Sequence, residues 1–395
     1  MDGRAARRYQ AAMAALVQTP AVSPANGRAV GYWLIAVALL IAAMVTVGGL
    51  TRLTGSGLSI TEWHPVTGAV PPLSNQAWQA EFAKYQHIPQ YRFENRGMSV
   101  SEFKTIYWWE WTHRLLGRLI GFVFLLPMLF FIATGAIARA GIPRMLVLFA
   151  LGGLQGFVGW WMVESGLETR VSVSQYRLAI HLGVALVLFA AIVWTALEYL
   201  FPRPFAGDVR LQAGEGGQVV SNSPLRLAAL RLFTTSPVSG GGKFALIFVA
   251  LVYFQMLLGA LVAGLHAGLV YNTWPSMNGR VFPEHAFAPK PWWLSFFEND
   301  GLAQFDHRLG AYLIAAGAVW LWVRSRKLAA RVRVSADVVL AVTIVQVTLG
   351  IVTLLNQAPV ALAALHQATA VALLTAALWH AFEWSRAPQP AVVSA

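Results

Sequence analysis

The chain has 395 residues, of which 57% are hydrophobic and 12% are charged, and it contains no Cys. A soluble domain has about 25% charged residues, so this composition excludes an ordinary water-soluble protein. The frequency of large apolar residues also excludes a disordered chain. Without Cys there can be no disulfides, thiolate-bound zinc or iron–sulfur clusters, so any metal or cofactor must be held by other groups.

Eight long apolar stretches follow one another along the chain. A bilayer crossing takes about 20 mainly apolar residues, and a backbone in lipid must satisfy its own hydrogen bonds, which favours helices. The sequence therefore predicts an all-α integral membrane protein with eight transmembrane helices. The predicted spans are residues 30–50, 113–136, 144–163, 177–200, 244–266, 307–324, 337–355 and 360–382.

The net charge of +12 is distributed unevenly among the connections. The N-terminal tail and alternate connections are rich in Arg and Lys, whereas the opposite loops mix basic residues with Glu and Asp. By the positive-inside rule, both termini are predicted to be cytoplasmic. The positive charge therefore indicates the orientation of the chain in the bilayer and not a nucleic-acid-binding function. Residues 1–29, rich in Arg and Ala, fit either a cytoplasmic tail or a targeting segment.

The two halves of the chain share a series of motifs. They correspond as follows: Gly48-Gly49-Leu50 with Gly259-Ala260-Leu261, Trp63 with Trp274, His113-Arg114 with His307-Arg308, Gln155 and Gly159 with Gln346 and Gly350, and His181 with His366. We interpret the halves as two tandem, pseudo-repeated four-helix bundles. An even number of spans in each unit makes the repeat parallel.

This repeat sets the predicted domain organisation. Residues 1–29 form a cytoplasmic tail and 385–395 a C-terminal tail. Residues 30–200 form the N-terminal unit, with a long outer loop at 51–107. Residues 201–243 are a cytoplasmic connection, and 244–384 form the C-terminal unit.

The chain has nine His. Five fall in predicted loops or near span ends, where a solvated imidazole needs no explanation: His64, His87, His266, His285 and His380. The other four lie in the first turns of predicted spans, at matching positions of the two halves: His113, His181, His307 and His366. An ionisable side chain in a membrane helix marks a functional site by default, the alternative being a hydrogen-bonded packing residue.

Two imidazoles that face each other across a four-helix bundle can supply both axial ligands of a haem iron. The predicted pairs are His113 with His181 and His307 with His366. Zinc fits less well, because neither pair comes with Cys or a carboxylate. Arg114 and Arg308 are candidates to pair with haem propionates, and snorkelling to the headgroups is the alternative interpretation.

One difference between the halves bears on chemistry. Glu110 stands three residues before His113, whereas Gln304, which cannot ionise, stands three residues before His307. The two residues of each pair share a helix face. An acid beside one haem site alone suggests that this site performs chemistry while the other carries electrons. A Glu that stabilises the start of its helix is the alternative.

Long motifs in both halves carry a family resemblance. They occupy residues 48–59, 62–68, 91–104 and 110–118 in the first half and 272–279 and 305–308 in the second. In these motifs, which span nearly the whole chain, the sequence resembles the haem A synthase family. In having no Cys, the sequence resembles the branch of this family found in mitochondria and proteobacteria.

The resemblance implies an enzyme that oxidises the C8 methyl of haem O to a formyl group, through hydroxylated intermediates, and so makes haem A for terminal oxidases. It implies that His113 and His181 bracket the substrate haem O and that Glu110 is essential. It further implies that His307 and His366 hold a haem b cofactor.

The resemblance also implies a location and partners. The location is the bacterial inner membrane, or alternatively the mitochondrial one, with the haem sites toward the periplasm. The partners are an electron donor, either ferredoxin-like or a quinol, the haem O synthase (a farnesyl transferase) and oxidase assembly factors. Span faces rich in Gly and Trp permit a homo-oligomer.

The residues alone leave two other functions open. One is a di-haem b-type membrane protein that transfers electrons from quinol. The other is a transporter, which rests only on spans and repeats and lacks the broken midplane helices expected of one.

Overall fold

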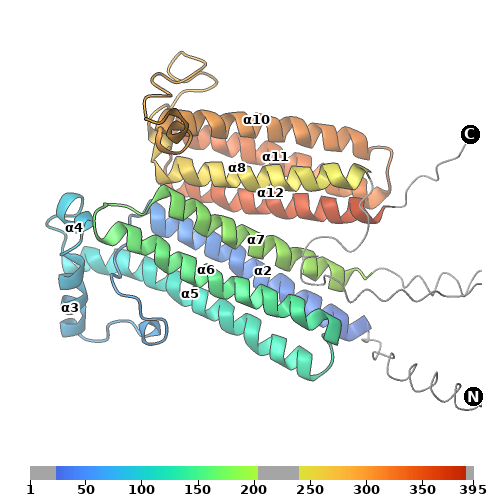
Figure 1. The fold of residues 1–395 in the computed structure, drawn as a ribbon, viewed down its shortest axis with the longest axis horizontal. Coiled ribbons are helices and arrows are strands. Elements are labelled where there is room, and N and C mark those ends of the chain that lie inside the picture. Colours follow the sequence, from blue (N-terminus) through green and yellow to red (C-terminus); the bar gives the residue numbers. More distant parts are fainter. Residues whose placement is uncertain (1–23, 203–239, 388–395) are drawn as a thin grey trace, which may run out of the picture.

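The computed structural model describes residues 24–202 and 240–387, and in these ranges the chain is helical without β-strands. Its long helices lie in two groups side by side (Figure 1). One group contains α2 (Pro24–Leu53), α5 (Val100–Ala133), α6 (Ile142–Leu167) and α7 (Gln175–Leu200). The other contains α8 (Gly240–Gly264), α10 (Asp300–Ser325), α11 (Ala330–Leu355) and α12 (Val360–Arg386).

Seven of these helices are long and apolar enough to cross a membrane: α2, α5, α6, α7, α8, α11 and α12. The all-helical membrane architecture and seven of the predicted spans are thereby confirmed for the described ranges. The predicted span at 307–324 lies on α10, whose 26 residues give a length of about 39 Å. Asp306, Arg308 and Arg324 make this helix less apolar than the others.

Several helices begin before the predicted span starts, and at α5 and α10 polar side chains account for the earlier start. At α5, Ser99 Oγ accepts a hydrogen bond from the Glu102 amide at 3.3 Å, and Glu102 accepts one from the Ser99 amide at 2.8 Å. At α10, Asn299 accepts from the Leu302 amide at 2.8 Å. Such caps satisfy the free amides of a first turn, so hydropathy alone misses these turns.

The predicted outer loop at 51–107 contains further helices and the start of α5. α3 (Asn75–Tyr85) and α4 (Pro89–Phe93) lie beside the first turns of α5 (Figure 1). Trp78, Tyr85 and Phe103 are buried together there, with the Tyr85 and Phe103 rings 5.3 Å apart. A second segment at the same end of the helices runs from α8 to α10 and contains α9 (Ser295–Glu298) (Figure 1).

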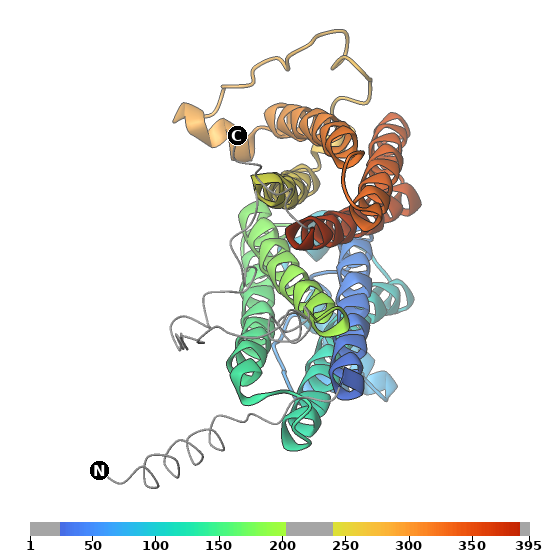
Figure 2. The same cartoon turned by 90° about the vertical axis from the view of Figure 1, so that its right-hand side faces the viewer.

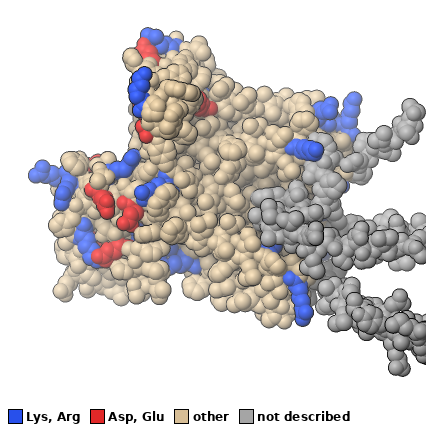
Figure 3. All heavy atoms as spheres, in the orientation of Figure 1, with Lys and Arg blue, Asp and Glu red and all other residues tan. Residues whose placement is uncertain are grey.

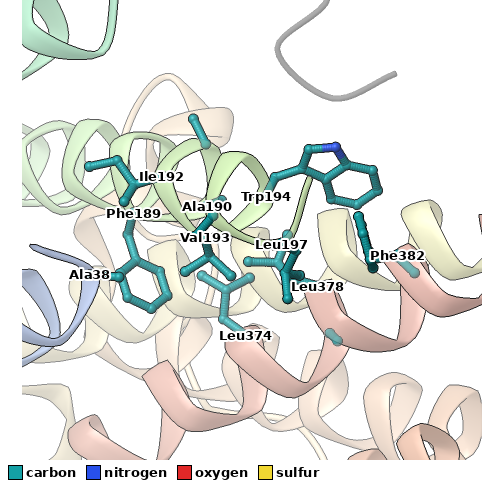
Figure 4. Packing of buried hydrophobic residues seen from close by; sticks show 14 of the residues in the cluster. Ala38, Phe189, Ala190, Ile192, Val193, Trp194, Leu197, Leu374, Leu378 and Phe382 are labelled. Carbon is teal, nitrogen blue, oxygen red and sulfur yellow. The ribbon is translucent and has the colours of Figure 1, made fainter. Parts of the chain in front are cut away.

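The two groups meet along α2 and α7 on one side and α8 and α12 on the other (Figure 2). Figure 4 shows Phe189, Val193 and Leu197 of α7 beside Leu374 and Leu378 of α12. A polar contact crosses the same junction, where Gln367 of α12 donates to the Val45 carbonyl of α2 at 2.7 Å. A large part of the apolar core therefore lies between the two groups.

Charged side chains in the view of Figure 3 gather at the two ends of the helices and leave the middle uncharged. The acidic groups visible there lie at the end that carries α3, α4 and the α8–α10 segment. An uncharged middle is what a hydrocarbon layer requires.

Candidate functional site

Each of the four span histidines packs its imidazole against a glycine of a neighbouring helix. A methyl group placed on Gly48, Gly159, Gly259 or Gly350 would lie 2.8, 2.8, 3.2 or 2.9 Å from Cε1 of His113, His181, His307 or His366, respectively. Contacts this short mean that a larger residue at any of these glycines would displace the imidazole. The same arrangement therefore recurs at four positions, two in each helix group.

The structure brings the predicted partners together. The rings of His307 and His366 are 6.4 Å apart and inclined by 78°, and His113 lies near enough to His181 for the imidazoles to interact electrostatically. Two metal–imidazole bonds of about 2 Å each, with the ring radii, give a centroid separation of about 6 Å. The second pair therefore fits two axial ligands of one iron.

Buried nitrogen atoms at both pairs support this fit. Nδ1 of His113 and Nδ1 of His366 have no hydrogen-bond partner within the described chain. Buried polar atoms are nearly always satisfied, so these two point to a ligand. The pairs are not larger clusters, since no group of three or more His, Asp or Glu suited to a metal occurs in residues 24–202 and 240–387.

Three glutamine amides lie against the imidazoles. Gln155 Nε2 is 3.1 Å from Nδ1 of His181, Gln255 Nε2 is 3.1 Å from Nδ1 of His307, and Gln346 Nε2 is 3.4 Å from Nε2 of His366. Sequence comparison of the halves paired Gln155 with Gln346 but missed Gln255. The signal was available, because each Gln stands four residues before the glycine that contacts the same His.

Glu110 is only 2% exposed and its carboxylate is fully engaged. Oε2 accepts hydrogen bonds from Ser59 Oγ and the Ile60 amide, both at 2.8 Å. Oε1 accepts from Arg114 Nε at 3.1 Å and Nη2 at 2.6 Å. The acid predicted beside His113 is thus held in one position by an ion pair and two further donors.

The second group repeats this arrangement without the charge. Gln304 is 3% exposed, donates to the Ala267 carbonyl at 2.8 Å and accepts from Arg308 Nη2 at 2.9 Å. Arg308 also donates to the Tyr271 carbonyl at 3.0 Å, as Arg114 does to the Ile60 carbonyl at 2.7 Å.

A polar network in the segment between α2 and α5 lies beside Arg114. Lys84 donates to Glu62 at 2.9 Å, and His64 lies 3.0 Å from the same carboxylate oxygen. These bonds hold the pKa of Glu62 below its usual value, and Glu62 and Glu81 raise the pKa of Lys84. The Glu62 carbonyl in turn accepts from Arg114 at 3.0 Å.

One of the remaining histidines differs from expectation. His380 is not solvated at a span end but lies within α12 with 1% of its surface exposed, its Nδ1 2.9 Å from Ser335 Oγ. The helix continues to Arg386, beyond the predicted limit at residue 382, which buries this turn. His113 likewise lies well inside α5 and not in its first turns, since α5 begins at Val100.

Facing membrane helices that carry two half-buried histidine pairs define a multi-pass membrane protein with two candidate sites for a planar metal cofactor. A family model described as cytochrome oxidase assembly protein matches residues 31–378, and the chain belongs to this family.

Curated relatives cover most of the chain. It is 48% identical over 356 residues to a protein of Parvibaculum lavamentivorans, a match that covers 90% of this chain and 94% of the relative. It is 48% identical over 375 residues to a protein of Bradyrhizobium diazoefficiens, with 93% and 95% covered. A third relative, from a Bradyrhizobium species, is 50% identical over 357 residues, a match that covers 89% of this chain and 90% of the relative. All three are named heme A synthase.

Proposed function

We propose that the chain is a haem A synthase, which oxidises the C8 methyl of haem O to the formyl group of haem A. Its family and the names of its relatives support this activity. The observation that carries the assignment to a site is the difference between Glu110 and Gln304 at otherwise equivalent positions. A reaction site needs an ionisable group that an electron-carrying site can lack.

In this proposal His113 and His181 bind the iron of the substrate haem O. Glu110 is the catalytic carboxylate, and Arg114, Ser59 and the Ile60 amide fix its orientation through the bonds described above. Because every carboxylate oxygen has a donor, Glu110 is preorganised before substrate arrives. It can then hold or accept a proton as the methyl carbon is oxidised.

His307 and His366 would hold haem b, which supplies electron transfer when bound. Gln255 and Gln346 contact these two imidazoles through their side-chain amides and restrict the orientation of the rings. Arg308 keeps a buried Nε without a partner in the described chain, which suits the predicted role in binding a propionate. Arg114 is the corresponding candidate in the first unit, although Glu110 already takes two of its donors.

The proposal includes the finer architecture. The two helix groups are tandem repeats of one four-helix unit, with α10 as the eighth span and the domain limits given above. Two parallels support the repeat. The hydrogen bonds of Arg114 and Arg308 match, and both α2 and α8 are followed by a left-handed residue, Gly55 with φ 65° and His266 with φ 54°.

Both termini would face the cytoplasm and the haem sites the periplasm, in the inner membrane of a bacterium. The basic residues of the short α5–α6 and α10–α11 connections, which include Arg139, Arg326 and Lys327, support this orientation. The partners expected from the sequence belong to the same proposal: an electron donor, the haem O synthase, oxidase assembly factors and a second copy of the chain. Most of the predicted tails at 1–29 and 385–395 and most of the 201–243 connection lie outside the described residues, although α2 already begins at Pro24 and α12 continues to Arg386.

The test is to co-express the chain with a haem O synthase and to separate the extracted haems by chromatography. The wild-type chain should convert haem O to haem A. Glu110→Gln, which copies the amide of the second unit, should retain haem b and accumulate haem O. The matched control, Gln304→Glu, should still make haem A.

The similar histidine pairs of both units favour one second candidate, a di-haem b electron-transfer protein. It predicts two haem b groups and no change in the extracted haem type. Wild-type amounts of haem A from Glu110→Gln would refute the catalytic role of the carboxylate.

A further inference from the structure

Arg52 lies near the end of the helices that carries α3 and α4, and no side chain or carbonyl of the described residues accepts a hydrogen bond from its buried Nη2. Arg52 is in the last turn of α2. Arg114 and Arg308, by contrast, donate to a carboxylate or amide side chain and to backbone carbonyls. A guanidinium has five donors and no acceptor, so a buried one without a partner needs an anion or a set of acceptors.

The position of Arg52 relates it to the first histidine pair. Arg52 follows Gly48 by four residues, so the two lie on the same face of α2 about one turn apart. Gly48 is the residue against which the His113 imidazole packs. Arg52 therefore lies one turn further out on the helix face that lines the His113 site.

The junction between the two bundles forms the other side of this position. Gly49 faces Gln367 of α12, and burial together with the nearby charge of Arg52 lowers the pKa of His266, which follows α8. This imidazole is no counter-ion, because it is neutral or cationic. Arg52 therefore lies near an imidazole, that of His266, which cannot neutralise its charge.

The corresponding position of the second unit lacks the charge. Aligning Gly48 with Gly259 places Ala263 opposite Arg52. The extra cation accordingly belongs only to the unit that contains Glu110.

We propose that Arg52 binds a carboxylate of the substrate porphyrin, one of its propionates, at the junction of the two bundles. The inference rests on the proposed function, which places the substrate iron between His113 and His181. The polar edge of a haem held there faces the nearer aqueous side, which is where Arg52 lies. The apolar edge of the haem stays in the bilayer. A guanidinium suits this ligand because it can donate two parallel hydrogen bonds to one carboxylate.

The experiment compares haem O with its dimethyl ester, in which both propionates are masked. Each is titrated into purified protein that already carries haem b, and binding is followed by absorbance. The wild-type protein should prefer the free acid by about tenfold or more, the value of one charge-assisted bond. Arg52→Gln should lose most of that preference while it binds the ester as before. Arg139→Gln, at an exposed arginine of the α5–α6 connection, should keep the wild-type preference.

Three outcomes would overturn the inference. The first is a wild-type preference in Arg52→Gln. The second is loss of haem b from Arg52→Gln with an unchanged preference for haem O, which would assign the propionate to the cofactor. If Arg52→Gln does not fold, Arg52→Met, which keeps the length of the side chain without its charge, replaces it, and an unchanged preference in that variant is the third.

A parallel titration separates this inference from the proposed function. His113→Ala should abolish haem O binding. If His113→Ala binds haem O normally, the location of the substrate site fails. If only the Arg52 variants behave as wild type, the site stands and the role of Arg52 fails.

Discussion

Glu110 and Arg114 form an ion pair that is almost completely removed from water, with side chains 3% and 13% exposed. Removing one partner of such a pair leaves the other charge buried and costs about 3–5 kcal/mol. Replacing both partners avoids that penalty. The pair can therefore be tested for stability and for chemistry separately.

We expect Arg114→Gln to lower the thermal unfolding temperature in detergent and to stop haem A formation, because Glu110 loses its counter-ion. The double variant Glu110→Gln/Arg114→Gln should recover much of the stability but no activity. Differential scanning calorimetry and haem extraction report the two effects. Equal instability of the single and double variants would contradict the ion-pair explanation.

The glycines beside the histidines are a second feature at the scale of single residues. Gly350→Ala places a methyl group 2.9 Å from Cε1 of His366, closer than packed carbon atoms allow, so the imidazole must move. We expect this variant to retain less haem b and to show an altered low-spin spectrum.

Two further variants control for helix propensity and for the choice of unit. Gly152→Ala, which meets no atom within 4 Å, should leave the haem b spectrum unchanged. Gly159→Ala displaces His181 and should also preserve haem b. A normal spectrum from Gly350→Ala would show that the contact does not set the position of the ligand.

At the scale of elements, α3 stabilises the start of α5, which leads to Glu110. Phe103 is fully buried there and contacts the rings of Phe82 and Tyr85 at 5.1 and 5.3 Å. Its replacement by Ala should cost about 3–5 kcal/mol. Since Ser59 and Ile60 of the same outer segment bind Glu110, loosening this cluster should also disturb the carboxylate.

We expect Phe103→Ala to make the segment between α2 and α5 sensitive to limited proteolysis and to reduce haem A formation without loss of haem b. Phe93→Ala, at a side chain that is 78% exposed, is the matched control and should resist protease like the wild type. Unchanged proteolysis of Phe103→Ala would show that this cluster does not hold the segment in place.

The elements also show how far sequence reasoning reaches. Apolar runs such as residues 177–200 predict their helices because every helix that crosses the bilayer needs a similar length of apolar residues. Helix starts such as Ser99 depend on local capping, which a hydropathy average ignores. The histidine pairs were predicted from matching positions in the two halves. The partners of Glu110 were missed because Ser59 and Ile60 reach it through the fold from 51 and 50 residues away.

At the scale of the whole molecule, the two helix groups are joined by close approach of α7 and α8. A methyl group on Gly183 would lie 2.9 Å from the Tyr253 hydroxyl and 3.3 Å from Leu257 Cδ2. Small residues at helix contacts in membranes permit this approach, and packing is a main source of stability there. The junction should therefore respond strongly to side-chain volume.

We expect Gly183→Val to lower the unfolding temperature and to slow haem A formation, since the added volume separates the units. Gly152→Val, on the open face of α6, gives a matched increase in volume without a neighbour and should leave both properties near wild type. If the two variants unfold alike, the helix propensity of Val and not the junction would explain the loss.

The unequal partners of the two arginines also set an electrical difference across the molecule. Glu110 neutralises Arg114, whereas Gln304 leaves the charge of Arg308 uncompensated at its contact. A nearby positive charge stabilises the form of a redox centre that holds one more electron. Arg308 should therefore raise the reduction potential of a centre between His307 and His366, whereas in the other helix group that effect is left to Arg52, because Glu110 cancels the charge of Arg114.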